Sequence, residues 1–483
     1  GANNTALGSY ALRYSTTSDN NTAIGKSAAT NTTGQNCTAV GAVALANNTT
    51  GSQNTAIGTE AMQENTTATG NTAVGYEALR DNTTAVRHVA VGYAALRENE
   101  DASDNTALGY FCLAANTTGA SQVAVGSHSL QANTTGSWNV AVGQQSLNSA
   151  TTASHNIAIG HQALYANTTG QENLAIGSHA LDANTTGLDN IAIGYMALST
   201  ATEASYNTAV GVESMQESTT AAYCTSLGYQ ALEETTTGGS NTAVGCFAMD
   251  NNTTGYGNTA MGYGALDANT TGYSNTAIGR EALKNCTTNI ENTALGRNSL
   301  KEVTTGGYNT GLGYNTGSNI TTGQFSVNVG AYAKPSAADT DNEITIGYSA
   351  IGKGTNTAFI SPNGGAVYAG NNSTDFATTS DRRIKKNIVD NTTGLDKINQ
   401  IRVRNFEYRT EDEIVDFDNP GAAVVNQEGV QLGVIAQEIE DILPDVVKTE
   451  STGVKRVDAS NIKWYLINAV KELSARVAAL EAT

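Results

Sequence analysis

Side chains that can take part in covalent chemistry gather near the C-terminal end of the chain. The segment reads Thr379-Ser380-Asp381-Arg382-Arg383-Ile384-Lys385-Lys386 and combines hydroxyls, a carboxylate and cations. A serine hydroxyl is a weak nucleophile until a base removes its proton, and a lysine amine can be that base only where burial or nearby cations lower its pKa. Taken alone, the cationic run from Arg382 to Lys386 favours a plainer interpretation, a solvated basic patch or a look-alike of a nuclear localisation signal.

The cysteines and histidines predict neither a disulfide framework nor a metal site. The cysteines are odd in number, show no CxxC spacing and have no neighbouring pair of histidines. We therefore expect space-filling cysteines, no metal and no cofactor. The histidines have no repeated carboxylate partner, so we expect them at the solvated surface. These residues are Cys37, Cys112, Cys224, Cys246 and Cys286, and His88, His128, His155, His161 and His179.

Most of the chain is one repeat, and this repeat predicts the scaffold. Asn54-Thr55-Ala56-Ile57-Gly58 and close variants recur every 17 residues. The glycine, called here the marker glycine, occurs in 21 copies from Gly8 to Gly347, with a single 16-residue step between Gly25 and Gly41. Such regularity means that one structural unit is stacked many times. With only 14% charged and 6% aromatic residues, the composition does not suit a conventional layered core.

Each copy has apolar positions on both sides of the marker glycine. The residue before the glycine is aliphatic or Met in all 21 copies, and the residue four positions after it is Leu or Met in 17. A separation of five positions does not fit a helical face; it favours two short strands joined at a bend, with Asn-Thr-Thr-Gly as the loop. The Asn column four positions before the glycine predicts an amide ladder. Two large apolar side chains per coil are too few to close a single-chain core, which favours association of chains.

The period ends after Gly347, and the composition changes at Ser380. We predict a shaft over residues 1–347, a transition or tip region over 348–379, and a separate domain over 380–483, where charges are dense and Gly is sparse. Helical periodicity is present at 434–443 and 459–480. The last segment has one apolar stripe, suited to a short helical bundle between chains, formed by Ile462, Leu466, Ala469, Leu473, Val477 and Leu480.

The repeat resembles the head repeats of trimeric autotransporter adhesins of the YadA type. The resemblance rests on the Asn-Thr-Ala-Ile-Gly motif and covers about 340 residues, although the 17-residue period is longer than is usual there. It implies a left-handed parallel β-roll in a three-fold assembly.

The C-terminal segments resemble the intramolecular chaperone domain of phage endosialidases and other tail fibres, the peptidase S74 family. The residues that carry this resemblance are the junction Thr379 to Ile388, Leu395-Asp396-Lys397-Ile398 with Phe406-Glu407-Tyr408-Arg409, Gly433-Val434-Ile435-Ala436-Gln437-Glu438 with Pro444, and Trp464-Tyr465. The resemblance implies that this domain assembles a homotrimer and then cuts the bond between Thr379 and Ser380.

The same resemblance implies roles for residues of the junction. Ser380 would be the nucleophile and Lys385 its base, since the family's serine and lysine stand five residues apart, and Asp381 and Arg383 would orient the site. The cut would be a single self-cleavage, and no turnover enzyme is expected in the shaft. The fold expected is mainly β, a trimeric parallel β-roll followed by an α+β domain that ends in a helical bundle.

The expected function is that of a bacteriophage tail fibre in the virion. Its partners would be a host cell-surface receptor, a glycan or a surface protein, and other virion proteins reached through an N-terminal part that is missing from this chain. A net charge of −19 argues against nucleic acid or an anionic membrane as partner, and no apolar run is long enough to insert into a membrane.

The sequence fits three other functions less well. A trimeric bacterial surface adhesin would use the repeats for host or matrix binding, but no stalk or anchor follows Leu480. A depolymerising tailspike needs a non-periodic pair of carboxylates, which the repeats lack. Ice binding needs threonines two positions apart, whereas Thr66 and Thr67 are adjacent.

Tyrosines that follow the marker glycine either pack as a column or offer their rings to sugars.

Overall fold

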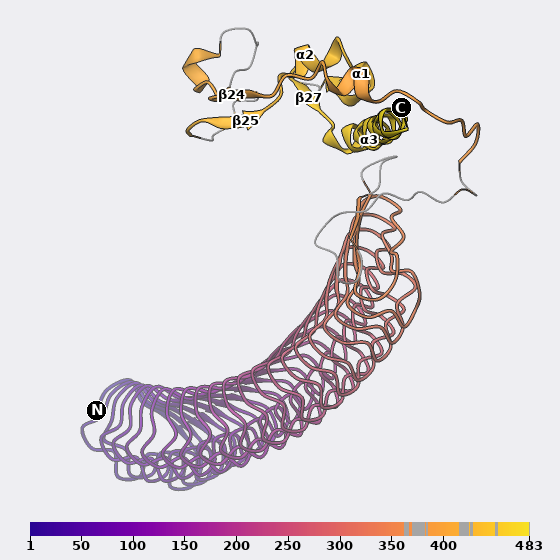
Figure 1. The fold of residues 1–483 in the computed structure, drawn as a ribbon. Coiled ribbons are helices and arrows are strands. Elements are labelled where there is room, and N and C mark those ends of the chain that lie inside the picture. The colour runs from indigo at the N-terminus through magenta and orange to yellow at the C-terminus, as the bar shows by residue number, and fades with distance from the viewer. Residues whose placement is uncertain are drawn as a thin grey trace. The chain divides into compact units, whose positions relative to one another are not determined.

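The computed structural model describes residues 1–361, 367–369, 382, 385–414, 425, 428–449 and 453–482. The chain divides into two units, Gly1–Thr379 and Ser380–Thr483. The first unit is a stack of similar coils, and the second is a small α+β unit that ends in a helix (Figure 1). The expected fold class, mainly β with an α+β C-terminal region, is confirmed.

Every coil of the first unit contributes one three-residue strand to a single parallel sheet. The strands are β1 (Thr5–Leu7), β2 (Thr22–Ile24), β3 (Thr38–Val40), β4 (Thr55–Ile57), β5 (Thr72–Val74), β6 (Val89–Val91), β7 (Thr106–Leu108), β8 (Val123–Val125), β9 (Val140–Val142), β10 (Ile157–Ile159), β11 (Leu174–Ile176), β12 (Ile191–Ile193), β13 (Thr208–Val210), β14 (Thr225–Leu227), β15 (Thr242–Val244), β16 (Thr259–Met261), β17 (Thr276–Ile278), β18 (Thr293–Leu295), β19 (Thr310–Leu312), β20 (Val327–Val329), β21 (Ile344–Ile346) and β22 (Ala358–Ile360).

The parallel register follows the repeat, so that equivalent residues of neighbouring coils lie side by side. Thr55 pairs with Thr72 and Ala56 with Ala73, and the same pairing recurs along the stack. Parallel winding continues one strand beyond the last marker glycine, because β21 pairs with β22. There β23 (Val367–Ala369) turns back and pairs antiparallel with β22.

The expectation of two strands per coil is wrong. The segment after the marker glycine is a turn, in which the second and fourth residues take left-handed backbone conformations, as in Glu60 with φ of 60° and Met62 with φ of 50°. A strand cannot contain such residues, since extended backbone needs negative φ. The coil therefore closes by curling after the glycine instead of by a second strand.

The core of the first unit is narrow and closes within one chain. In strands β2 to β21 the middle residue, usually Ala, is buried, and the Leu or Met four positions after the marker glycine is almost always fully buried as well. The aliphatic residue just before the glycine points outward instead and is not buried in any of the 21 copies. The prediction that a single chain could not close its core was wrong, because small Ala side chains and paired amides fill the space that large residues would otherwise need.

Two buried columns of Asn bind successive coils together, which confirms the predicted amide ladder. In the column four positions before the marker, Asn54 Oδ1 accepts from the backbone N–H of Asn71 at 3.0 Å. Asn71 Nδ2 donates to the carbonyl of Ala85 at 3.0 Å. In a second column, seven positions after the marker, Asn65 Nδ2 donates to Asn48 Oδ1 at 2.7 Å. Buried amides are tolerated in this core because each has partners in the next coil.

His88 occupies an Asn position of the first column and is only 1% exposed, so its expected surface location is wrong. Its Nδ1 accepts from the backbone N–H of Asn105 at 3.2 Å, as an Asn oxygen would. Burial lowers the pKa of His88 to about 4. Four cysteines are buried, as expected for space-filling residues, and three of them, Cys37, Cys224 and Cys286, occupy positions of the Asn columns. Cys246 is exposed.

We expect His88 to make the shaft sensitive to acid. The folded state keeps the ring neutral while an unfolded histidine titrates near 6.5, so stability falls as pH drops from about 6.5 to about 4, by on the order of 3 kcal/mol. His88→Asn should remove this loss. The measurement is the thermal unfolding of the unaltered chain and of His88→Asn from pH 7.5 to 4, and the difference in stability between the two proteins at each pH reports on His88.

The two proteins must be compared because other titrating groups change the stability of the shaft with pH in the opposite direction. Burial, followed by the charge of neighbouring carboxylates, raises the pKa of Glu233 to about 7 and that of Asp250 to about 6, so these groups stabilise the folded shaft as pH falls. Both proteins share them. An unchanged acid profile in His88→Asn would contradict the assignment to His88.

The marker glycines are required both by backbone conformation and by the stack. Gly75 has a φ of 141°, and a Cβ at this position would lie 2.2 Å from the carbonyl oxygen of Gly92 in the next coil. We expect Gly75→Ala to destabilise the shaft by on the order of 3 kcal/mol, because strain and clash add.

Gly70 of the preceding loop is the matched control. Its φ is 75° and nothing lies within 4 Å of an added Cβ, so Gly70→Ala should cost only about 1 kcal/mol. Denaturant unfolding of the two variants measures the difference, and equal losses would contradict the argument from stacking.

The second unit builds a small core around one long helix. Its elements are α1 (Leu395–Ile398), β24 (Arg404–Phe406), the 3-10 helix η2 (Glu411–Glu413), β25 (Gln431–Gly433), α2 (Ala436–Glu440), the 3-10 helix η4 (Pro444–Val446), β26 (Val447–Thr449), β27 (Lys455–Val457) and α3 (Ala459–Glu481). Strands β24 and β25 pair antiparallel, as do β26 and β27. Ile439, Leu443 and Val446 are buried at the centre of the unit, where Ile462 and Tyr465 of α3 pack against them.

Candidate functional site

The predicted cleavage residues fall mostly outside the described part of the chain. Thr379, Ser380, Asp381 and Arg383 all lie outside the described residues. Lys385 is described and exposed, and its backbone N–H donates to the carbonyl oxygen of Arg382 at 3.3 Å. The pairing of the Ser380 hydroxyl with the Lys385 amine therefore stays a prediction from the sequence. The described residues show how the chain that follows Lys385 is held.

The chain just after the junction is clamped to helix α3. Asn468 Nδ2 donates to the carbonyl oxygens of Asn391 at 2.7 Å and Thr393 at 3.1 Å. The backbone N–H of Leu395 donates to Glu472 Oε2 at 3.1 Å. These contacts tie the chain that leaves Lys385 to one face of the helix.

Gly394 allows this close approach. A Cβ there would lie 2.6 Å from the backbone nitrogen of Ala469, so a larger residue would push the segment away from the helix. Sequence reasoning missed Asn468 and Glu472, because single polar residues on a helix carry no periodic signal.

The opposite face of α3 presents an exposed apolar stripe. Leu466, Val470, Leu473, Val477 and Leu480 are spaced alternately by four and three residues, and each is at least 45% exposed. Ala469, which the sequence placed in this stripe, is 4% exposed and packs toward Gly394, so Val470 takes its place. Alternate spacing of this kind is the seam of a coiled coil.

Polar pairs fix α3 and its neighbours within the unit. Arg404 of β24 donates to Glu438 of α2 at 2.7 and 3.3 Å, and these bonds lower the pKa of the Glu438 carboxyl. Tyr465 of α3 donates to Asp445 Oδ2 at 2.8 Å. Burial, and then this hydrogen bond, raises the pKa of Tyr465. Each pair includes one residue, Glu438 or Tyr465, of the segments on which the family resemblance rests.

The first unit carries a second candidate surface along its sheet. The aliphatic residues just before the marker glycines form an outward rank, here called the outer rank, and neighbours in the strand such as Val89 and Ile157 extend it. Exposure is 39% at Ile57, 48% at Leu227 and 67% at Leu7 in the first coil. Strand alternation places the Thr and Ile of Thr-Ala-Ile on one face and the Ala on the other, but it does not show which face is buried.

Tyrosines after the marker glycine form columns, as expected, and their rings stay partly exposed. Tyr76 and Tyr93 stack with ring centroids 5.1 Å apart, and Tyr93 and Tyr110 with centroids 5.3 Å apart. Similar pairs form at another corner of the coil, as in Tyr206 and Tyr223 at 5.1 Å.

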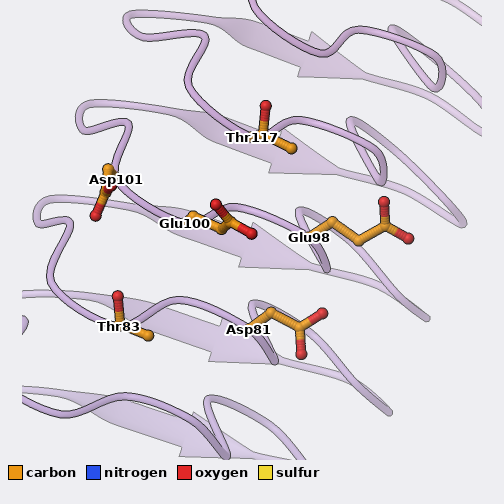
Figure 2. Close-up of a pocket in the computed structure, with 6 residues that line it drawn as sticks. All are labelled: Asp81, Thr83, Glu98, Glu100, Asp101 and Thr117. Atoms are coloured by element: carbon orange, nitrogen blue, oxygen red, sulfur yellow. The ribbon is translucent and has the colours of Figure 1, made fainter.

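An acidic hollow of about 550 Å³ lies on the fifth to seventh coils, lined by Asp81, Thr83, Glu98, Glu100, Asp101 and Thr117. Figure 2 shows its carboxylates spread over two neighbouring coils instead of converging on one point. Asp81 pairs with Arg80 at 2.7 Å, Glu98 pairs with Arg97, and Asp101 accepts from Thr84 at 3.0 Å. Among the residues that the structure describes, no group of His, Cys, Asp and Glu is placed to hold a metal ion.

Comparison with known proteins finds similarity over parts of the chain. An uncharacterized membrane protein of Dictyostelium discoideum is 29% identical over 132 residues, which is 26% of this chain and 7% of that protein. The chain thus spans only a small part of that relative. No solved structure matches. No helix within the described residues is long and apolar enough to cross a membrane.

The family comparison concerns the second unit. It extends from Ser380, the first residue of that unit, through η4 to β26. After a long parallel solenoid, residues 380–448 of this chain match the family of the chaperone of endosialidase, peptidase S74.

Proposed function

We propose that this chain is a subunit of a homotrimeric bacteriophage tail fibre, located in the virion, whose C-terminal unit assembles the trimer and is then released by a cut between Thr379 and Ser380. The shaft would bind a host cell-surface receptor. The observation that carries the proposal is that the match to the chaperone family begins at Ser380, the residue with which the second unit begins along the chain.

The chemistry proposed for the cut uses Ser380 and Lys385. The Lys385 amine takes the proton of the Ser380 hydroxyl, whose oxygen attacks the carbonyl carbon of Thr379. The C–N bond between the two residues breaks, the nitrogen takes up a proton as the new terminus, and water then hydrolyses the ester. Asp381 and Arg383 are assigned to orienting these groups.

The α3 stripe supports association of the C-terminal units. Five exposed aliphatic residues at coiled-coil spacing are costly in water and are covered when helices of several copies pack together. The spacing puts Val at the a positions and Leu at the d positions, a pattern that by itself favours two helices, so the number three comes from the family resemblance alone.

The outer rank supports association of the shafts. Covering a half-exposed aliphatic side chain contributes roughly 1 kcal/mol, and the rank repeats in 21 coils, so a small gain per coil adds up along the shaft. The left-handed winding and three-fold arrangement implied by the repeat belong to this proposal.

Assembly by the C-terminal unit would solve a problem of register. Near-identical coils can associate out of step by whole repeats with little loss of contact, and such states slow folding. Three C-terminal units that join first bring the shafts into step. Once they are removed, the trimer is separated from its unfolded state by a high barrier.

The test is the mass and shape of the purified full chain. Light scattering should give three copies per particle, and negative-stain micrographs should show an elongated shaft. A folded single copy at micromolar concentration, with the C-terminal unit attached and dispensable, would sink the proposal.

A further inference from the structure

The last coils of the shaft depart from the repeat, and this departure opens a hollow. The column four positions after the marker glycine ends with fully buried Leu300 and then continues as Gly317, Lys334 and Ile351. Ile351 is 49% exposed. A hollow of about 450 Å³ results, lined by Asn315, Ser318, Tyr332, Lys334, Tyr348 and Ser349 along with Ile351.

The rings at this end of the shaft stand perpendicular to one another. Tyr332 stands at 88° to Tyr314 and at 90° to Tyr348, with ring centroids 5.1 and 6.2 Å apart. In earlier coils Phe247 is likewise perpendicular to Tyr229 and Tyr263, at 87° and 85°, whereas Tyr76 and Tyr93 stack at 20°. In a parallel stack each ring covers the face of the next, whereas perpendicular rings leave faces open. Tyr348 is 75% exposed, more than Tyr229 at 43% or Tyr263 at 48%.

The polar groups around the hollow are available to a ligand. Within the part of the chain that the structure describes, the side chains of Asn315, Ser318 and Lys334 make no hydrogen bond or ion pair with other residues. They supply an amide, a hydroxyl and an ammonium group. A concave surface that joins aromatic faces to a few unpaired polar groups has the composition of a small-ligand site.

We propose that this hollow binds a pyranose that carries a carboxylate. The C–H groups of a pyranose pack on the electron-rich faces of tyrosines, its hydroxyls pair with the amide and hydroxyl side chains, and Lys334 pairs with the carboxylate. The inference rests on the proposed role of the shaft in receptor binding and names the class of ligand at one place on it.

The probes are methyl β-D-glucuronide and methyl β-D-glucoside, which share a ring and differ in the carboxylate. Saturation-transfer NMR and titration with the full chain should show the glucuronide binding about three- to tenfold more tightly, as a partly exposed ion pair allows. Tyr348→Ala should abolish binding of both. Lys334→Gln should remove the preference and leave weak binding of the glucoside.

Tyr76→Ala is the matched control, since Tyr76 also follows a marker glycine but lines neither this hollow nor the acidic one. It should bind both probes as the unaltered chain does. Tyr348 and Lys334 are exposed or half-exposed, so their variants should keep the thermal unfolding midpoint of the parent.

Three results would overturn the inference: no saturation transfer from either probe, equal affinity for both, or binding that survives Tyr348→Ala. Its failure is separable from that of the proposed function. A trimer that cuts itself but does not bind the glucuronide contradicts only the ligand site, whereas a single uncut chain that binds it contradicts only the fibre.

Discussion

Replacing Ser380 by Ala should leave the chain entirely uncut. The unaltered protein should separate on denaturing gels into a shaft fragment and a fragment of residues 380–483. Without the hydroxyl no ester can form, so the fragment should vanish instead of forming more slowly. Lys385→Ala should reduce the rate by at least about a hundredfold, the usual contribution of a positioned base.

Lys386→Ala is the matched control for charge, since Lys386 is the next residue and is likewise exposed. It should cut at the normal rate. Mass spectrometry of the released fragment should find Ser380 as its first residue. Cleavage that persists in Ser380→Ala, or a fragment that begins elsewhere, would refute the assignment of the nucleophile.

The uncut variant also separates cleavage from assembly. Ser380→Ala and the unaltered chain should both reach the mass of a trimer, because the clamp acts before the cut. Only the cut protein should resist unfolding kinetically, and the uncut variant should refold after dilution from denaturant. This comparison uses the same shaft in both cases.

Leu473→Glu should prevent assembly of the whole protein. Leu473 lies in the middle of the exposed α3 stripe, and three glutamates brought together at one level of a coiled coil would be desolvated and repel one another. We expect light scattering to show single copies or irregular aggregates of shaft, and no released fragment if cutting needs the assembled unit.

Ala475→Glu is the matched control on the same helix. Ala475 is exposed and lies on a different face from the stripe, and Glu is a good helix former, so the helix itself should be as stable as with Leu473→Glu. A trimer in both variants would show that the stripe does not hold the C-terminal units together. Circular dichroism confirms that both variants keep their helix content.

Much of the shaft could be predicted from its sequence because the 17-residue period sets which residues of neighbouring coils lie side by side. A residue lies beside those 17 positions away, so the Asn column predicted a ladder, and Asn54 and Asn71 do bond to one another. The same reasoning predicted the C-terminal helix, where apolar spacing alone defines α3 (Ala459–Glu481).

Which apolar column faces the core could not be predicted from the sequence. The sequence places aliphatic residues on both sides of each marker glycine but does not say which of them faces inward. Left-handed residues such as Met62 curl the chain after the glycine, so Met62 turns into the core while Ile57 stays outside. That choice depends on closure of the whole coil, which no local pattern expresses.

By itself the sequence determined the stacked coils, the required marker glycines, the last helix and the family resemblance at Ser380, since each depends on local conformation, spacing or residue identity. Only the tertiary structure decided that His88 is buried, that Asn468 and Glu472 hold the chain beyond Lys385, and that a hollow opens beside Tyr348. These features depend on contacts between segments that are brought together only when the coil or the C-terminal core closes.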